Sequence, residues 1–166
     1  GRGSINRGGV ELDECICKML SERVKEYAQQ TDAGWRMQEA ENLKISFANQ
    51  IRDLGTERES AGPRLEYRIV FPEGGSADIA MRPADFREVV IPELSLIEKP
   101  MKAALRYAND IEERKASDQL TLGSICNVFL AGGTSLLLFV RDEVKRVFEQ
   151  ASNPVPTTDV DPRKAI

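Results

Sequence analysis

A pair of glycines followed by two hydroxyl side chains is the segment of this sequence best suited to chemistry. Gly132-Gly133-Thr134-Ser135 follows a short apolar run rich in β-forming residues, Val128 to Ala131, and precedes apolar residues with helical spacing. This pattern predicts a strand, a tight turn and a helix. Glycines let a ligand approach closely, and Thr134 or Ser135 can cap the helix while N–H groups at its positive end stay free. The segment is either an anion or nucleotide site or an ordinary strand-to-helix connection of an α/β protein.

Two other segments carry polar groups at suggestive spacings. Glu41 and Lys44 lie three residues apart in a predicted helix, so we expect them on one exposed face, as site residues or as a weak surface ion pair. Asp53-Leu-Gly-Thr56 matches the Asp-x-Gly-Thr of phosphate loops in actin-like ATPases, where the aspartate ends a buried strand. Here it comes after a helical pattern, which favours Gly55 as a helix C-cap and the next residues as a solvated loop.

Histidine is absent from the chain, which removes the commonest general base and the commonest zinc ligand. Cys15 and Cys17 are two apart on a predicted helix and therefore point in different directions, and Cys126 starts the apolar strand. Three thiols neither complete a zinc site nor pair evenly, so we interpret them as small buried apolar residues in a reducing compartment. We predict no catalytic residue and no metal site.

The composition fits a folded protein with a real core. The chain has 166 residues, of which 41% are hydrophobic, enough for one domain or two small lobes. A net charge of −4 and a pI near 5.1 argue against a nucleic-acid surface. No apolar run approaches the roughly 20 residues needed to span a bilayer, and the N-terminus lacks the pattern of a secretory signal. We therefore expect a cytoplasmic protein that binds neither nucleic acid nor membrane.

Periodicity predicts the elements of the first half. Residues 1–8 are interpreted as a tag remnant or linker. Apolar residues at three- and four-residue spacing predict a helix from Val10 to about Gln30 and a second from Trp35 to about Leu54. Alternation over Leu65–Phe71, a turn at 72–76 and a return over Ala77–Met81 predict an antiparallel hairpin.

The second half is predicted to be helical around the central strand. Pro83 suits the first turn of a helix, and Pro92 is expected to restart the chain into another helix, kinked or broken at Pro100. The apolar stripe of that helix is predicted to contain Leu94, Ile97, Met101, Ala104, Leu105 and Ala108. A charged connector over 109–123 leads to the strand, and a helix with the stripe Leu137, Val140, Val144, Val147 and Phe148 comes after it.

Taken in order, these segments resemble the second half of the nucleotide-binding domain of DnaK-type chaperones, the seventy-kilodalton heat-shock family with the actin-like ATPase fold. Gly8-Gly-Val-Glu-Leu-Asp13 resembles the family's Gly-Gly-x-x-Phe-Asp, and Glu41-Asn-Leu-Lys44 its Glu-x-x-Lys helix. Met81–Phe86 resembles its Ile-Thr-Arg-x-x-Phe, and Pro100–Leu105 resembles its Pro-Val-x-x-Ala-Leu. Val128–Ser135 resembles its adenosine motif, and Asp161–Ala165 resembles its Asn-Pro-Asp-Glu-Ala. The match runs from Gly8 to Ile166.

The resemblance implies an α/β (α+β) fold, with an upper lobe of helices and a small antiparallel sheet over 9–121 and a strand, turn and helix of the lower lobe over 122–166. It implies an excised fragment that contributes the adenosine side of a cleft for ATP or ADP. The residues matching Glu41 and Lys44 touch the ribose in that family, and the turn matching Gly132, Gly133 and Thr134 lies against the adenosine. The phosphate loops lie upstream, so Mg²⁺ is expected only in an intact parent and the fragment alone is expected to be inactive.

Three departures leave other functions open. Ile45 and Leu136 stand where the family has arginines that stack on adenine, and Arg163 stands where it has an acid near the base. An apolar slot made by Ile45 and Leu136 could still hold adenine. The alternatives are a divergent interaction module without nucleotide turnover and a filament-forming actin relative. The partners that the resemblance implies are a co-chaperone or nucleotide-exchange factor on the upper lobe and protein clients of the parent.

Overall fold

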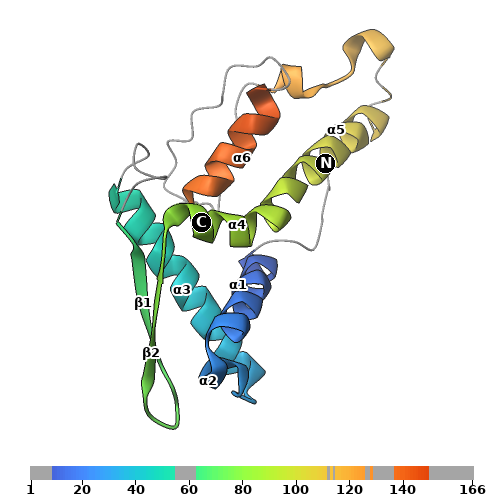
Figure 1. Cartoon of the computed structure of the whole chain (residues 1–166). Coiled ribbons are helices and arrows are strands. Elements are labelled where there is room, and N and C mark those ends of the chain that lie inside the picture. Colours follow the sequence, from blue (N-terminus) through green and yellow to red (C-terminus); the bar gives the residue numbers. More distant parts are fainter. Residues whose placement is uncertain are drawn as a thin grey trace.

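The computed structural model describes residues 9–54, 63–111, 113, 115–125, 128 and 137–149. Helices dominate this part of the chain, and its two strands form one antiparallel hairpin (Figure 1). The mixture of helices with a small antiparallel sheet agrees with the predicted class. The central strand that the sequence predicts at Val128 to Ala131 falls almost wholly outside the described residues.

The first predicted helix is interrupted near its end. Helix α1 spans Gly9–Arg23 and the short helix α2 spans Lys25–Ala28, because Val24 between them is extended, with φ −126° and ψ 104°. The change of direction brings Tyr27 against Trp35, with ring centroids 5.8 Å apart, and lets its hydroxyl donate to the Arg36 carbonyl at 2.6 Å. The expected continuous helix to Gln30 is therefore wrong, since burying Tyr27 requires the turn at Val24.

Helix α3, Ala33–Leu54, is the longest element and begins two residues earlier than predicted. Asp32 explains the difference, because its Oδ1 accepts the Trp35 N–H at 3.0 Å and so caps the first turn. Of the apolar stripe that predicts this helix, Ala40, Leu43, Phe47 and Ile51 are buried, whereas Met37 and Leu54 are half-buried. Helix α3 packs against both α1 and the hairpin (Figure 1).

The hairpin has the predicted boundaries within a residue. Strand β1, Leu65–Val70, pairs with β2, Ser76–Met81, in a register that places Leu65 opposite Met81. Gly74 and Gly75 have φ values of +98° and +88°, which side chains rarely adopt, so the turn needs both glycines. At the outer edge of β1, the carboxamide of Gln50 exchanges two hydrogen bonds with the backbone of Glu66.

Helix α4, Pro83–Leu94, begins at the predicted proline but continues through Pro92. Val90 and Leu94 on either side of Pro92 are both buried, so packing holds the helical path although one backbone hydrogen bond is missing. A 3₁₀ turn at Ser95–Ile97 then precedes helix α5, Glu98–Ile111. The expected restart at Pro92 is therefore wrong. The expected break lies within one turn of Pro100, because the α-helical path is interrupted at Ser95–Ile97, the turn that contains the Leu96 carbonyl to which Pro100 cannot donate.

Helix α5 extends away from the rest of the molecule (Figure 1). None of its side chains is fully buried, so the stripe predicted for it, from Met101 to Ala108, is only half-covered. Two more 3₁₀ turns come next, at Ala116–Asp118 and Leu122–Ser124. Both turns begin within the segment for which the sequence predicts a charged connector, and the first three residues of that segment, 109–111, belong to α5.

Helix α6, Leu138–Glu149, confirms the final predicted helix, and Leu137 with the four other residues of its predicted stripe is buried. Its first turn joins the same hydrophobic cluster as α1, α3, the hairpin and α4. The rings of Phe47, Phe86 and Phe139 form a continuous contact, with centroids 5.1 Å and 6.2 Å apart. The core therefore links α3 to the start of α6 through α4.

Candidate functional site

A buried ion pair connects α1 to α3 at the segments that the resemblance singles out. Lys44 Nζ donates a hydrogen bond to Asp13 Oδ2 at 2.9 Å, lies 2.7 Å from Asp13 Oδ1 and reaches the Gly9 carbonyl at 3.4 Å. The side chains of Lys44 and Asp13 are only 7% and 8% exposed. Burial raises the pKa of Asp13, and the hydrogen bond and charge of Lys44 act against that rise. The pair therefore compensates two buried charges where the helices cross.

Only part of the predicted face of α3 is open to solvent. Glu41 is exposed, and its Oε2 accepts a hydrogen bond from Gln38 at 3.3 Å. Ile45 is 47% exposed, one turn further along the helix. Lys44 points inward, so the expectation that it shares an exposed face with Glu41 is wrong. The physical reason is Asp13, which offers the ammonium group a buried carboxylate 31 residues away in the sequence.

The remaining predicted site residues are Gly132, Gly133, Thr134, Leu136 and Arg163, and they lie outside the described residues. Beyond the predicted glycine turn, Leu137 is 1% exposed and belongs to the core cluster, and α6 contacts α3. Arg87 lies over the ring of Phe139, with its Cζ 5.8 Å from the ring centroid. The chain directly after the predicted turn is thus anchored in the core that also holds α3.

Asp53 does not have the setting of a phosphate loop. It lies in the last turn of α3, is exposed, and approaches Arg52 at 3.7 Å. A phosphate-loop aspartate ends a buried strand, so the helical interpretation of this residue is confirmed. Gly55 and Thr56, which would complete the motif, lie outside the described residues.

Two polar clusters were missed by the sequence reasoning. Glu143 is buried on α6 and accepts from Arg146 at 2.6 Å, while Arg146 Nη2 also lies 3.7 Å from Glu98 at the start of α5. Cys17 lies 3.2 Å from the Tyr27 hydroxyl, and burial raises the pKa of both groups. The spacing of Glu143 and Arg146 is a helical ion-pair signal, whereas nothing in the sequence links Cys17 to Tyr27.

Cys15 and Cys17 are free thiols and are half-buried, less covered than predicted. Across the described ranges, no three Cys, Asp or Glu side chains gather closely enough to hold a metal ion.

Comparisons with family models and with curated proteins do not assign the chain to a family. No protein-family model matches the chain, and a search of curated proteins finds no match. Among the helices that the structure describes, none combines the length and apolar character required to cross a membrane.

Proposed function

We propose that this chain is the adenosine-side part of a nucleotide-binding unit of the DnaK-type chaperone class. The observation that carries the proposal is the buried pair of Asp13 and Lys44. Asp13 closes the segment that resembles Gly-Gly-x-x-Phe-Asp, and Lys44 closes the one that resembles Glu-x-x-Lys. Two motifs matched separately along the sequence therefore meet in space, as parts of one site would.

In this proposal the residues of α3 have different roles. Lys44 directs its ammonium group at Asp13 and at the Gly9 carbonyl, so in this proposal it is a positioning residue that fixes α3 against α1. Of Glu41, Lys44 and Ile45, only Glu41 has an exposed polar group that can bind a ribose hydroxyl. Ile45 offers an apolar surface to an adenine ring in place of a stacking arginine.

The nucleotide proposed is ADP or ATP, held through its base and ribose. The family's phosphate loops have no counterpart in the residues that the structure describes, and Asp53 is helical and exposed. Binding should therefore be weak. A change from a micromolar to a millimolar dissociation constant corresponds to about 4 kcal/mol, a reasonable combined loss for two stacking arginines and the phosphate contacts.

A titration with ADP tests the proposal. Saturable changes in the amide signals of α3 around Glu41 and Ile45 are expected, and Glu41→Ala should weaken binding about tenfold, the loss of one hydrogen bond to a charged group. Glu88→Ala is the matched control, because Glu88 is an exposed acid on α4, a helix that carries none of the candidate residues. Absence of saturable shifts at millimolar ADP, or equal weakening by both variants, would refute the adenosine site.

A second candidate function is an interaction module of the same fold that has lost nucleotide binding. Ile45 favours it, because a large apolar side chain that is 47% exposed on a helix is suited to a protein contact. The same titration separates the two functions. The interaction module predicts no response of α3 to ADP.

A further inference from the structure

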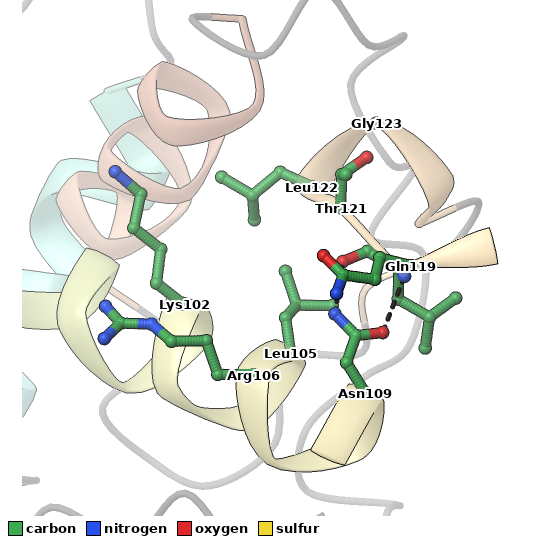
Figure 2. Close-up of a pocket in the computed structure, with 9 residues that line it drawn as sticks. Lys102, Leu105, Arg106, Asn109, Gln119, Thr121, Leu122 and Gly123 are labelled. Atoms are coloured by element: carbon green, nitrogen blue, oxygen red, sulfur yellow. Dashed lines mark hydrogen bonds between the residues drawn. The ribbon is translucent and has the colours of Figure 1, made fainter. Parts of the chain in front are cut away.

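A cleft with a volume of about 470 Å³ opens between α5 and the segment after it. Figure 2 shows Lys102, Leu105, Arg106 and Asn109 projecting from successive turns of α5 on one side, with residues 119–123 on the other. A volume of this size is within the range of sites for small organic molecules. Glu41, Lys44 and Ile45, the candidate nucleotide-binding residues that the structure describes, do not line it, so it is a separate feature of the molecule.

The far wall of the cleft is held in place by specific hydrogen bonds. The Asn109 carboxamide accepts the Leu120 N–H at 2.7 Å and donates to the Leu120 carbonyl at 2.9 Å (Figure 2). Next to it, Ser124 N donates to the Thr121 carbonyl at 3.0 Å, and Thr121 N donates to Ser124 Oγ at 3.2 Å. The cleft is therefore formed before any ligand arrives, which lowers the ordering cost of binding.

The charge of the cleft is positive although the chain as a whole carries −4. Lys102 and Arg106 lie one helical turn apart, and no acidic residue is among the described residues that line the cleft. Lys102 pairs with Glu98, whereas Arg106 has no hydrogen bond or ion pair within the described part of the chain. A guanidinium group without a carboxylate partner can form paired hydrogen bonds with a planar or tetrahedral anion.

We propose that this cleft binds a small organic anion, a carboxylate or phosphate monoester attached to an apolar body. The anionic group lies at Arg106, supported by the ammonium group of Lys102. The apolar body contacts Leu105 and Leu122, which Figure 2 shows on opposite sides of the opening. A cation without an ion-pair partner among the described residues, combined with two leucine side chains, selects such a ligand over inorganic anions and over neutral apolar molecules.

Binding of four matched probes tests this proposal. Hexanoate and hexyl phosphate carry the apolar body with the two alternative anionic groups, hexanamide carries the same body without charge, and inorganic phosphate carries charge without the body. Saturable amide shifts confined to 102–109 and 119–124 are expected with the first two probes, and the tighter one identifies the anionic group. Equal binding of hexanamide or of inorganic phosphate would overturn the proposal, as would shifts spread over other helices.

Variants on the same helix locate the site. Arg106→Met should raise the dissociation constant of the tighter probe about tenfold, since it removes a charged hydrogen-bond donor. Lys99→Met is the matched control, because Lys99 is exposed on α5 and lies outside the cleft. Both variants change exposed side chains, so circular dichroism should show an unchanged fold. Equal affinities of Arg106→Met and Lys99→Met for the probe would overturn the assignment.

Discussion

Lys44 shows how a single side chain changes its role when its partner comes from another helix. Three residues from Glu41, it has the spacing of a surface ion pair, yet its ammonium group is buried against Asp13. The sequence distance between Asp13 and Lys44 hides the pair, because no local pattern connects residues 31 positions apart. Glu41 and Ile45 could be placed on the open side of α3 from helical spacing alone, and both lie there.

The first prediction concerns this ion pair. At neutral pH, Lys44→Met should lower the free energy of unfolding by about 3 kcal/mol, because it leaves the Asp13 carboxylate buried without its cation. Burial raises the pKa of Asp13, and losing Lys44 raises it further. An acid whose pKa is raised in the folded state destabilises the folded protein at pH values above that raised pKa, and this effect disappears below the pKa of the unfolded state, 3.8 for an aspartate. The loss of stability caused by Lys44→Met should therefore shrink as the pH falls toward 3.8.

Urea unfolding of the wild type and Lys44→Met at neutral and acidic pH measures this effect. The double variant Asp13→Asn/Lys44→Met should recover part of the loss at neutral pH, because it removes the unpaired charge as well. An equal loss at both pH values would show that packing of the lysine chain, rather than its charge, stabilises the contact.

At the scale of elements, sequence periodicity located the helices and the hairpin but misplaced their interruptions. Val24 and Pro92 are the instructive positions. A valine gives no warning of a break, and the break there depends on burying Tyr27 under the Arg36 carbonyl. A proline signals a break, yet α4 continues because Val90 and Leu94 are held in the core. At Val24 and at Pro92, tertiary packing overrides the local conformational preference of the residue.

The second prediction concerns the aromatic contact between α3 and α4. Phe47 is fully buried on α3 and meets Phe86 of α4 edge-on, with ring centroids 5.1 Å apart. Phe47→Ala should lower the free energy of unfolding by about 4 kcal/mol, through lost burial and the cavity left behind. Ile45→Ala, on the same helix but 47% exposed, should change it by less than about 1 kcal/mol. Thermal or urea unfolding of the two variants measures both losses in the free energy of unfolding. Losses of similar size would show that Phe47 of α3 is not packed in the core.

At the scale of the whole molecule, α5 departs most from expectation. Its apolar stripe predicts a buried helix, whereas the helix projects from the body and is only half-covered (Figure 1). Periodicity states which face of a helix is apolar but not how much surface is available to cover it. The cleft beside α5 could not be predicted either, because it depends on Asn109 holding the backbone of Leu120.

The third prediction is that the purified chain hydrolyses no ATP above background. Phosphoryl transfer requires positioned phosphate ligands, Mg²⁺ and an oriented water, and Asp53 is an exposed residue of a helix end that supplies none of these. Phosphate release should therefore be the same for the wild type and Asp53→Ala. Turnover by the wild type that Asp53→Ala abolishes would show that the Asp53 segment is a phosphate loop after all.

The most direct test of the proposed adenosine face is a gain of affinity at Ile45. Ile45→Arg introduces a guanidinium group that can stack on adenine, worth about 1 kcal/mol, so the dissociation constant for ADP should fall about fivefold. Val70→Arg is the matched control, since Val70 is 63% exposed on β1, which carries no residue of the proposed adenosine face or of the cleft beside α5. Titration of both variants with ADP should show tighter binding for Ile45→Arg alone. Unchanged affinity in Ile45→Arg, or the same gain in Val70→Arg, would contradict the account.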